Sequence, residues 1–336
     1  MVVMFWITSD YYFSYLGMLR YNHIFKYKYM AKDTKINELL TQDQLKEIKQ
    51  RQDWRNVLSI ISNWSQIFIC FWLLYSYPSW VVFLISLIVV GSRQFALAVL
   101  MHEGAHKLLF SNLTINDWVS QWLCAYPIFQ DTKPYRPYHL KHHKFTETKQ
   151  DPDLILSAPF PISKSSLRRK IFRDLVGLTG WKRYSSTLIS IFSTKADNLP
   201  KKFILVSKKL RGFLVSNLVI FLFISYFFNW YIFFLLWWLP SLTYYSLIIR
   251  VRNIAEHVMV PNQNNLDNTR TTIASPVIRY LMVPHNVNYH LEHHLFISCP
   301  WYNLRKAHNM LKKNGFLDKM CIENSYLSVL KKASSG

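Results

Sequence analysis

The stretch His290-Leu291-Glu292-His293-His294, near the C-terminal end of the chain, decides how the rest of the sequence is interpreted. In a helix its three histidines stand at positions i, i+3 and i+4, so they share one face and lie a few ångströms apart. Metal coordination requires neutral imidazole nitrogens gathered in this way, whereas core packing does not. The stretch therefore predicts a metal site.

Further histidines repeat the pattern upstream. His139-Leu140-Lys141-His142-His143 has the same spacing, His102-Glu103-Gly104-Ala105-His106 places two histidines at i and i+4, and His257 makes a ninth. A single H-x-x-x-H would be weak evidence, because a lone histidine is usually a core or surface residue. We expect that ordinary role for His23 and His308. Nine of the twelve histidines in four compact groups are strong evidence for metal binding.

Apolar and charged residues are segregated along the chain. It has 336 residues and is 51% hydrophobic, yet its formal net charge is +21. Two runs of 37 residues, 56–92 and 213–249, contain no Asp, Glu, Lys or Arg. One helix of that length would measure about 55 Å, and the hydrocarbon core of a membrane is about 30 Å thick. Each run is therefore expected to form a hairpin of two spans, near residues 56–76, 79–101, 213–228 and 231–250.

The basic residues predict the orientation of these spans. Neither hairpin tip carries Lys or Arg, whereas residues 102–212 carry 19 against 8 acidic residues, and the part from residue 250 onward carries 11 against 5. Positive residues mark the cytoplasmic side of a membrane protein. Both termini and all four histidine groups are therefore expected to be cytoplasmic. The basic surface also suits anionic lipid headgroups and an acidic electron-donor protein, while no nucleic-acid-binding module accompanies the charge.

These patterns predict an all-α integral membrane protein, in which two helical hairpins carry a cytoplasmic helical cap with a two-metal site. We expect an N-terminal extension and surface helix in residues 1–54, a membrane domain in 55–320 and a C-terminal tail in 321–336. Residues 1–29 mix aromatic and charged residues, and a polar segment that follows Met30 suits an ordinary N-terminus, so we expect 1–29 either to be an extension or to lie upstream of the native start. Thr41 and Gln44 have the spacing of a capping box, which predicts a short helix on the membrane surface.

Three further features of the sequence bear on the membrane region and the metal site: an arginine deep in a predicted span, a short apolar segment and the cysteines. Arg93 lies deep in the second predicted span, where a charge needs a partner, and we expect it to pair with other helices rather than act in catalysis. Residues 116–129 are apolar but too short to span, which favours a re-entrant or interfacial helix. The four cysteines form no C-x-x-C pair, which argues against a thiolate metal site.

The number of histidines indicates how many ions are bound. A zinc ion takes three or four protein ligands, so nine imidazoles suit two ions with four or five nitrogen ligands each. Imidazole binds iron, zinc and copper alike, so the ligand type leaves the metal open. Two redox-active ions at the mouth of an apolar helix bundle favour oxygen chemistry on a lipid, in which the protein holds the ions and aligns one carbon of the chain.

The histidine boxes together resemble those of the integral-membrane fatty acid desaturase and hydroxylase superfamily, over roughly residues 55–310. The stretches 102–106, 151–153 (Asp-Pro-Asp) and 288–294 (Asn-Tyr-His-Leu-Glu-His-His) look most like bacterial-type fatty acid desaturases. The resemblance implies two iron ions and matches His257 to an additional ligand and Asn253 to an asparagine that acts through water. The implied ligands are His102, His106, His139, His142, His143, His257, His290, His293, His294 and Asn253. Five carboxylates could orient the rings of these histidines, and a solvated role is the alternative for each of them. They are Glu103, Glu256, Glu292, Asp151 and Asp153.

The resemblance implies that two hydrogens are removed from an acyl chain with O2 as the acceptor. The acyl chain would be carried by a lipid, by CoA or by an acyl-carrier protein. No cytochrome b5-like segment is recognised, so the electrons are expected from a separate ferredoxin, rubredoxin or cytochrome. A lipid or carotenoid hydroxylase or ketolase would use the same boxes, and a non-enzymatic membrane metal-binding protein is a further alternative. Resemblance alone favours the bacterial inner membrane over the endoplasmic reticulum.

Overall fold

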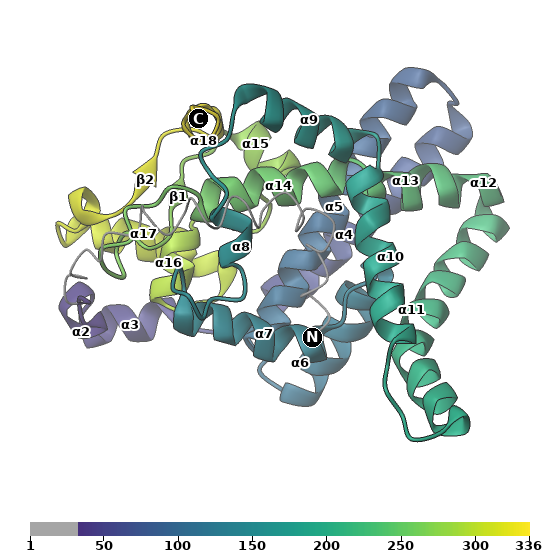
Figure 1. Cartoon of the computed structure of the whole chain (residues 1–336), viewed down its shortest axis with the longest axis horizontal. Helices are drawn as coiled ribbons and strands as arrows, with labels where there is room; N and C mark the ends of the chain where they lie inside the picture. The colour runs from purple at the N-terminus through teal and green to yellow at the C-terminus, as the bar shows by residue number, and fades with distance from the viewer. Residues whose placement is uncertain (1–32) are drawn as a thin grey trace.

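The structure is a computed structural model that describes residues 33–336, which are mostly helical (Figure 1). The expectation about residues 1–29 lies outside this described part. The α-helices are α2 (Ile36–Leu39), α3 (Gln42–Ile48), α4 (Asp53–Ser76), α5 (Trp80–Ala105), α6 (Leu113–Val119), α7 (Thr132–Phe145), α8 (Leu154–Ser157), α9 (Lys164–Leu175), α10 (Leu178–Phe192), α11 (Leu199–Phe227), α12 (Trp230–Ile232), α13 (Leu239–Leu242), α14 (Tyr244–His257), α15 (Pro276–Leu281), α16 (His290–Leu295), α17 (Leu304–Lys313) and α18 (Tyr326–Ala333). The strands are β1 (Thr271–Thr272) and β2 (Ile322–Glu323).

Four helical stretches are long and apolar enough to cross a membrane, as the charge pattern predicts. They are Gln42–Ser76, Trp80–Ala105, Leu199–Phe227 and Trp230–His257. α4 packs along α5, and the turns that follow α4 and α11 lie on the same side of the molecule, at the right of Figure 1. The helices α16 and α17, which follow the fourth stretch, lie on the opposite side.

The third apolar helix is longer than its hydrophobic run. α11 begins at Leu199 rather than near residue 213, because Asn198 caps it by accepting a hydrogen bond from the Lys201 backbone N–H and Pro200 occupies its first turn. The charge-free run predicts only the part of the helix that lies in the lipid. The capping residues determine where the helix itself begins. The charged first half of α11 therefore continues the helix beyond the apolar run.

The fourth stretch is a composite helix. A π-helical segment at Phe233–Trp238 and a break at Thr243 divide it into α12, α13 and α14. Pro240 lies just after the π-helical segment, and a proline cannot donate a backbone hydrogen bond within a helix. The last piece, α14, carries His257 at its C-terminal end.

Both ends of the described chain pack into the body of the protein. The capping box at Thr41 is confirmed, but α3 does not lie alone on a surface, since Leu45 and Ile48 join a buried cluster with Leu291 and Leu311. The segment expected to be a tail, 321–336, adds β2 to β1 as a short parallel pair, which is the only strand pairing among residues 33–336. Tyr326, Val329 and Ala333 of α18 are buried in clusters that include residues of α14, because their spacing places them on one face of a helix.

Candidate metal centre

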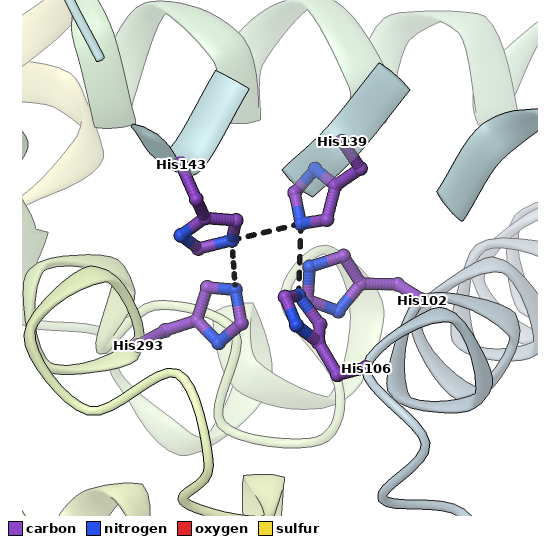
Figure 2. Close-up of side chains that lie close together, drawn as sticks. All are labelled: His102, His106, His139, His143 and His293. Carbon is purple, nitrogen blue, oxygen red and sulfur yellow. Dashed lines mark hydrogen bonds between the residues drawn. The ribbon is translucent and has the colours of Figure 1, made fainter. Parts of the chain in front are cut away.

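Five histidines converge at the end of α5. His102 and His106 come from α5, His139 and His143 from α7, and His293 from α16 (Figure 2). Their Nε2 atoms form a chain of close contacts: 3.0 Å between His106 and His139, 2.9 Å between His139 and His143, and 3.0 Å between His143 and His293. The Nε2 atom of His102 is buried and has no hydrogen-bond partner in the described part of the chain. We call these five residues the first histidine group.

Four more histidines form a second histidine group, which consists of His142, His257, His290 and His294. The Nε2 atoms of His257 and His290 lie 2.9 Å apart, and the Nε2 atom of His294 is buried without a partner among residues 33–336. The two groups adjoin, because the rings of His143 and His294, one from each group, have centroids 4.1 Å apart. Each H-x-x-H-H box is divided between the groups: His139 and His143 face the first and His142 the second, whereas His293 faces the first and its neighbours the second.

Burial keeps most of these imidazoles neutral. It lowers the pKa of His106 to about 3, with Arg136 adding to the effect, and the pKa of His143 to about 2, with the neighbouring histidines adding to it. Burial and the surrounding histidines also hold the pKa of His139, His290, His293 and His294 well below the ordinary value of 6.5. A neutral imidazole has a free nitrogen lone pair, which is the form that binds a metal.

The two groups fit metal ions. A ligand nitrogen lies about 2.0–2.1 Å from a bound divalent metal, so two such nitrogens at right angles are about 3.0 Å apart. The Nε2 contacts of 2.9–3.0 Å match that separation. Without a metal, two neutral imidazoles in contact can share only one hydrogen bond. The buried Nε2 atoms of His102 and His294 have no hydrogen-bond partner in the described chain. A bound cation would provide all of these nitrogens with a common partner.

Contacts from α6 and α7 hold the end of α5 that carries the first box. Arg136 donates from Nε to the Ala105 carbonyl at 2.9 Å and from Nη2 to the Gly104 carbonyl at 3.0 Å. Asn116 donates to the same Gly104 carbonyl, also at 3.0 Å. These carbonyls are among the last of α5, where the helix supplies few donors, so a cation and an amide add hydrogen bonds at its end. The same bonds attach α7, with two histidines of the group, to α5.

Gly104 allows the backbone of this box to approach the segment after α6 closely. A Cβ atom at position 104 would lie 2.1 Å from Ser120 Oγ and 2.3 Å from Ser120 Cβ. Gly104→Ala is therefore expected to destabilise the protein by about 1–3 kcal/mol through overpacking, and to lower the amount of metal retained on purification. Thermal unfolding and metal analysis of the purified chain measure both effects.

The double variant Gly104→Ala/Ser120→Gly is the matched control, because it removes the side chain against which the new methyl group would press. It should recover part of the lost stability and metal. If Gly104→Ala alone behaves like the wild type, the close approach has no bearing on the histidine group.

Asp151 is placed to orient His142. Its Oδ1 accepts from His142 Nδ1 and from the Asp153 backbone N–H, both at 2.8 Å, and its Oδ2 accepts from the Glu147 backbone N–H at 2.8 Å. Burial alone would lower the pKa of His142, but the Asp151 and Asp153 carboxylates outweigh it and raise the pKa. The proton therefore resides on Nδ1, facing Asp151, and Nε2 is left as the atom available for coordination.

Asp151→Asn is expected to weaken metal binding about 10- to 100-fold, as is usual when an orienting partner of a ligand is lost. Both carboxylate oxygens accept hydrogen bonds, so an amide of the same shape must turn its NH2 group toward a donor. Competition with a chelator measures the affinity, and Asp197→Asn, at an exposed position on the surface, is the control. Equal affinities in the two variants would show that Asp151 does not orient His142.

The other three predicted carboxylates have different surroundings. Glu256 Oε2 lies 3.5 Å from His290 Nδ1, and its Oε1 lies 2.6 Å from Arg252 Nε. Glu103 lies 3.8 Å from His102 Nδ1 and accepts a hydrogen bond from the Trp301 backbone at 3.0 Å. Glu292 is completely buried, but its contacts are to His308 and Thr271 rather than to one of the nine histidines. His308 is thus a buried polar residue beneath the third box.

Sequence reasoning missed two residues that face the second group. Thr146 Oγ1 lies 3.1 Å from His294 Nδ1, and Glu147 Oε1 lies 3.4 Å from His257 Nδ1. Burial, reinforced by Asp151, raises the pKa of Glu147 to about 7. Their position three and four residues after His143 is the one signal that points to them. Asn253 lies one turn before His257 on α14, and its side chain forms no hydrogen bond with a residue of the described chain.

An apolar crevice lies against the first group. Val99, Val287 and Leu304 line it together with His102, His290 and His293. Glu103, His285 and Trp301 complete its lining. The histidine nitrogens thus face a narrow space whose walls are largely apolar.

The four histidine-bearing segments that build this site also lie within a single family match. Residues 78–320 match the family described as "Fatty acid desaturase". The chain belongs to the fatty acid desaturase family. The sequence resemblance to this family is therefore confirmed, together with its membrane helices and the oxidoreductase class that the family name denotes.

Individual desaturases resemble this chain at lower levels of identity. The dihydrorhizobitoxine desaturase of Bradyrhizobium elkanii is 28% identical over 242 residues, which cover 68% of this chain and 67% of that protein. The chloroplastic omega-6 fatty acid desaturase of Spinacia oleracea is 22% identical over 297 residues, 84% of this chain and 64% of that protein. The corresponding protein of Glycine max is 22% identical over 283 residues, 80% and 64%. The chain thus spans about two thirds of the length of these relatives.

Proposed function

We propose that this chain is an O2-dependent membrane acyl desaturase that introduces a double bond into the acyl chain of a lipid, using electrons from a separate donor protein. The nine clustered histidines would hold two iron ions, five ligands at one and four at the other. The observation that carries the proposal is the pair of adjoining histidine groups, which share α7 and α16 and meet at His143 and His294. Imidazole alone does not select iron, so the choice of metal rests on the family.

When bound, the iron pair would supply redox chemistry in which O2, two electrons and two protons, together with two hydrogens of the acyl chain, give two water molecules and a double bond. The residues of the chain bind and orient. Asp151 holds His142 by its Nδ1 proton, Glu256 lies beside His290, and Asn253 would act through water. The aliphatic wall at Val99, Val287 and Leu304 would exclude bulk water from the reacting carbon.

The charge distribution supports an orientation for the enzyme. The spans would form two hairpins whose uncharged tips face away from the cytoplasm, with the histidine groups and both termini on the cytoplasmic side. There the basic surface would receive an acidic ferredoxin, rubredoxin or cytochrome. The acyl chain would be carried by a membrane lipid, by CoA or by an acyl-carrier protein, and the bacterial inner membrane is the favoured location.

The test is a lipid profile of a desaturase-deficient host that expresses the full chain, with the His293→Ala variant as the control. New unsaturated acyl chains that disappear in the variant would support the proposal and reveal the double-bond position. Lipids that retain 18O from 18O2 would instead assign the chain to hydroxylation or ketolation. A metal-loaded protein that yields neither product with any of the three donor classes would contradict an enzymatic role.

A further inference from the structure

A buried arginine in the second apolar helix has only neutral partners. Arg93 is 5% exposed, and its Nη2 donates to Ser92 Oγ at 2.8 Å and to the Tyr280 carbonyl. Its guanidinium carbon lies 4.5 Å from the centre of the Tyr280 ring, and its Nη1 donates to Asn63 Oδ1 at 3.5 Å. Across residues 33–336 no carboxylate pairs with it. A guanidinium remains charged at every accessible pH, so burying one without a counter-charge is costly.

Arg93 lines a cavity of about 350 Å³ whose only charged side chains are arginines. The second one, Arg279 of α15, is half-buried and donates to Asn286 Oδ1 at 2.7 Å, and it too has no carboxylate partner in the described chain. Tyr280, His285 and the remaining lining residues are uncharged or apolar. Two guanidinium groups and no acidic group make the cavity a place where an anion is favoured.

One wall separates this cavity from the first histidine group. His285 and Trp301 line both the cavity and the apolar crevice beneath His102 and His293, and their rings have centroids 4.6 Å apart. Asn63 connects this wall to Arg93, since its Nδ2 donates to His285 Nε2 at 3.1 Å while its Oδ1 accepts from the arginine. The cationic cavity and the crevice are therefore neighbouring compartments.

We propose that this cavity binds the anionic head of the substrate, a carboxylate or a phosphate attached to a long apolar chain. The inference rests on the proposed function and specifies its substrate class. The planar forks of Arg93 and Arg279 match the oxygens of either group and can form charge-assisted hydrogen bonds with it. The volume of the cavity lies within the range of small-molecule sites and is large enough for such a head.

The experiment measures competition for radiolabelled palmitate on the purified full chain in zwitterionic nanodiscs. Palmitate and 1-palmitoyl lysophosphatidate are expected to compete at least about tenfold more strongly than hexadecanol, which has the same chain length without the charge. The Arg279→Gln variant should remove most of that preference. The control Arg305→Gln deletes the same charge from an exposed position of α17 and should leave the preference intact. Arg279 is chosen because its partial exposure makes misfolding less of a risk than at buried Arg93.

Equal competition by palmitate and hexadecanol, or equal effects of the two arginine variants, would overturn the proposal. Stronger competition by palmitate identifies the carboxylate head of a free fatty acid, which would replace the three carriers proposed above, and stronger competition by the lysophosphatidate identifies a phospholipid head. The His293→Ala variant should keep the charge preference, because it lies outside the cavity. Charge-selective binding without any desaturated product would defeat only the proposed function, and desaturation without charge selectivity would defeat only the anion site.

Discussion

The His293→Ala and His142→Ala variants are each expected to abolish turnover while the protein still inserts and folds. His293 belongs to the first histidine group and His142 to the second, so each change removes one imidazole from a different set of ligands. If each group holds one ion, the loss at His293 leaves four histidines and the loss at His142 leaves three. The His142 variant should therefore release its metal more readily, because three ligands hold an ion less firmly than four.

The measurement combines iron content per chain with product formation, both on purified protein. Each variant should retain more iron than a metal-free preparation and less than the wild type, and neither should give product. Asn309→Ala, at an exposed position of α17, is the control and should match the wild type in both measurements. Wild-type activity in either ligand variant would contradict the assignment, and simultaneous loss of both ions from both variants would show that the groups do not bind independently.

The iron-depleted chain is expected to lose stability steeply between about pH 7.5 and about pH 5.5. Six histidines outside the apolar helices have pKa values far below 6.5 in the folded protein: His106, His139, His143, His290, His293 and His294. In the unfolded chain they would take up protons near pH 6.5. The unfolded state thus binds more protons as the pH falls, so stability is present above pH 6.5 and declines below it.

Each such histidine lowers the free energy of unfolding by about 1.4 kcal/mol over this interval. Several acting together approach a typical total stability of about 5–15 kcal/mol. His142 and Glu147, whose pKa values are raised, act in the opposite direction, but they are two residues against six. Thermal unfolding of the metal-free protein at the two pH values measures the effect.

Replacing two of these residues in the variant His106→Gln/His143→Gln should make the pH dependence shallower. A melting temperature that stays constant or rises on acidification would show that the metal-free groups do not remain packed and neutral. Iron-loaded protein serves as the reference, because bound metal competes with protons for the same nitrogens.

Local features of the sequence were enough to predict the elements of this fold. The two charge-free runs correspond to the four long apolar stretches, since the exclusion of charge from lipid depends on composition alone. Thr41 and Gln44 form the predicted capping box, because such a cap involves only residues three apart. Helix starts were less predictable, as at Leu199, where the cap lies well before the apolar run.

The spacing of the histidines was enough to indicate a multinuclear metal site, because i, i+3 and i+4 positions always share a helix face. Only the tertiary structure decided how the three boxes are divided, with His143 and His293 in the first group and His142 and His294 in the second. That division depends on the angle at which α7 and α16 approach α5, which no local pattern encodes. The same holds for Glu147 near His257 and for Arg279 beside Arg93, since these contacts join residues more than a hundred positions apart. Composition and period are local properties of a chain, whereas the partners of a buried charge are set by packing between distant segments.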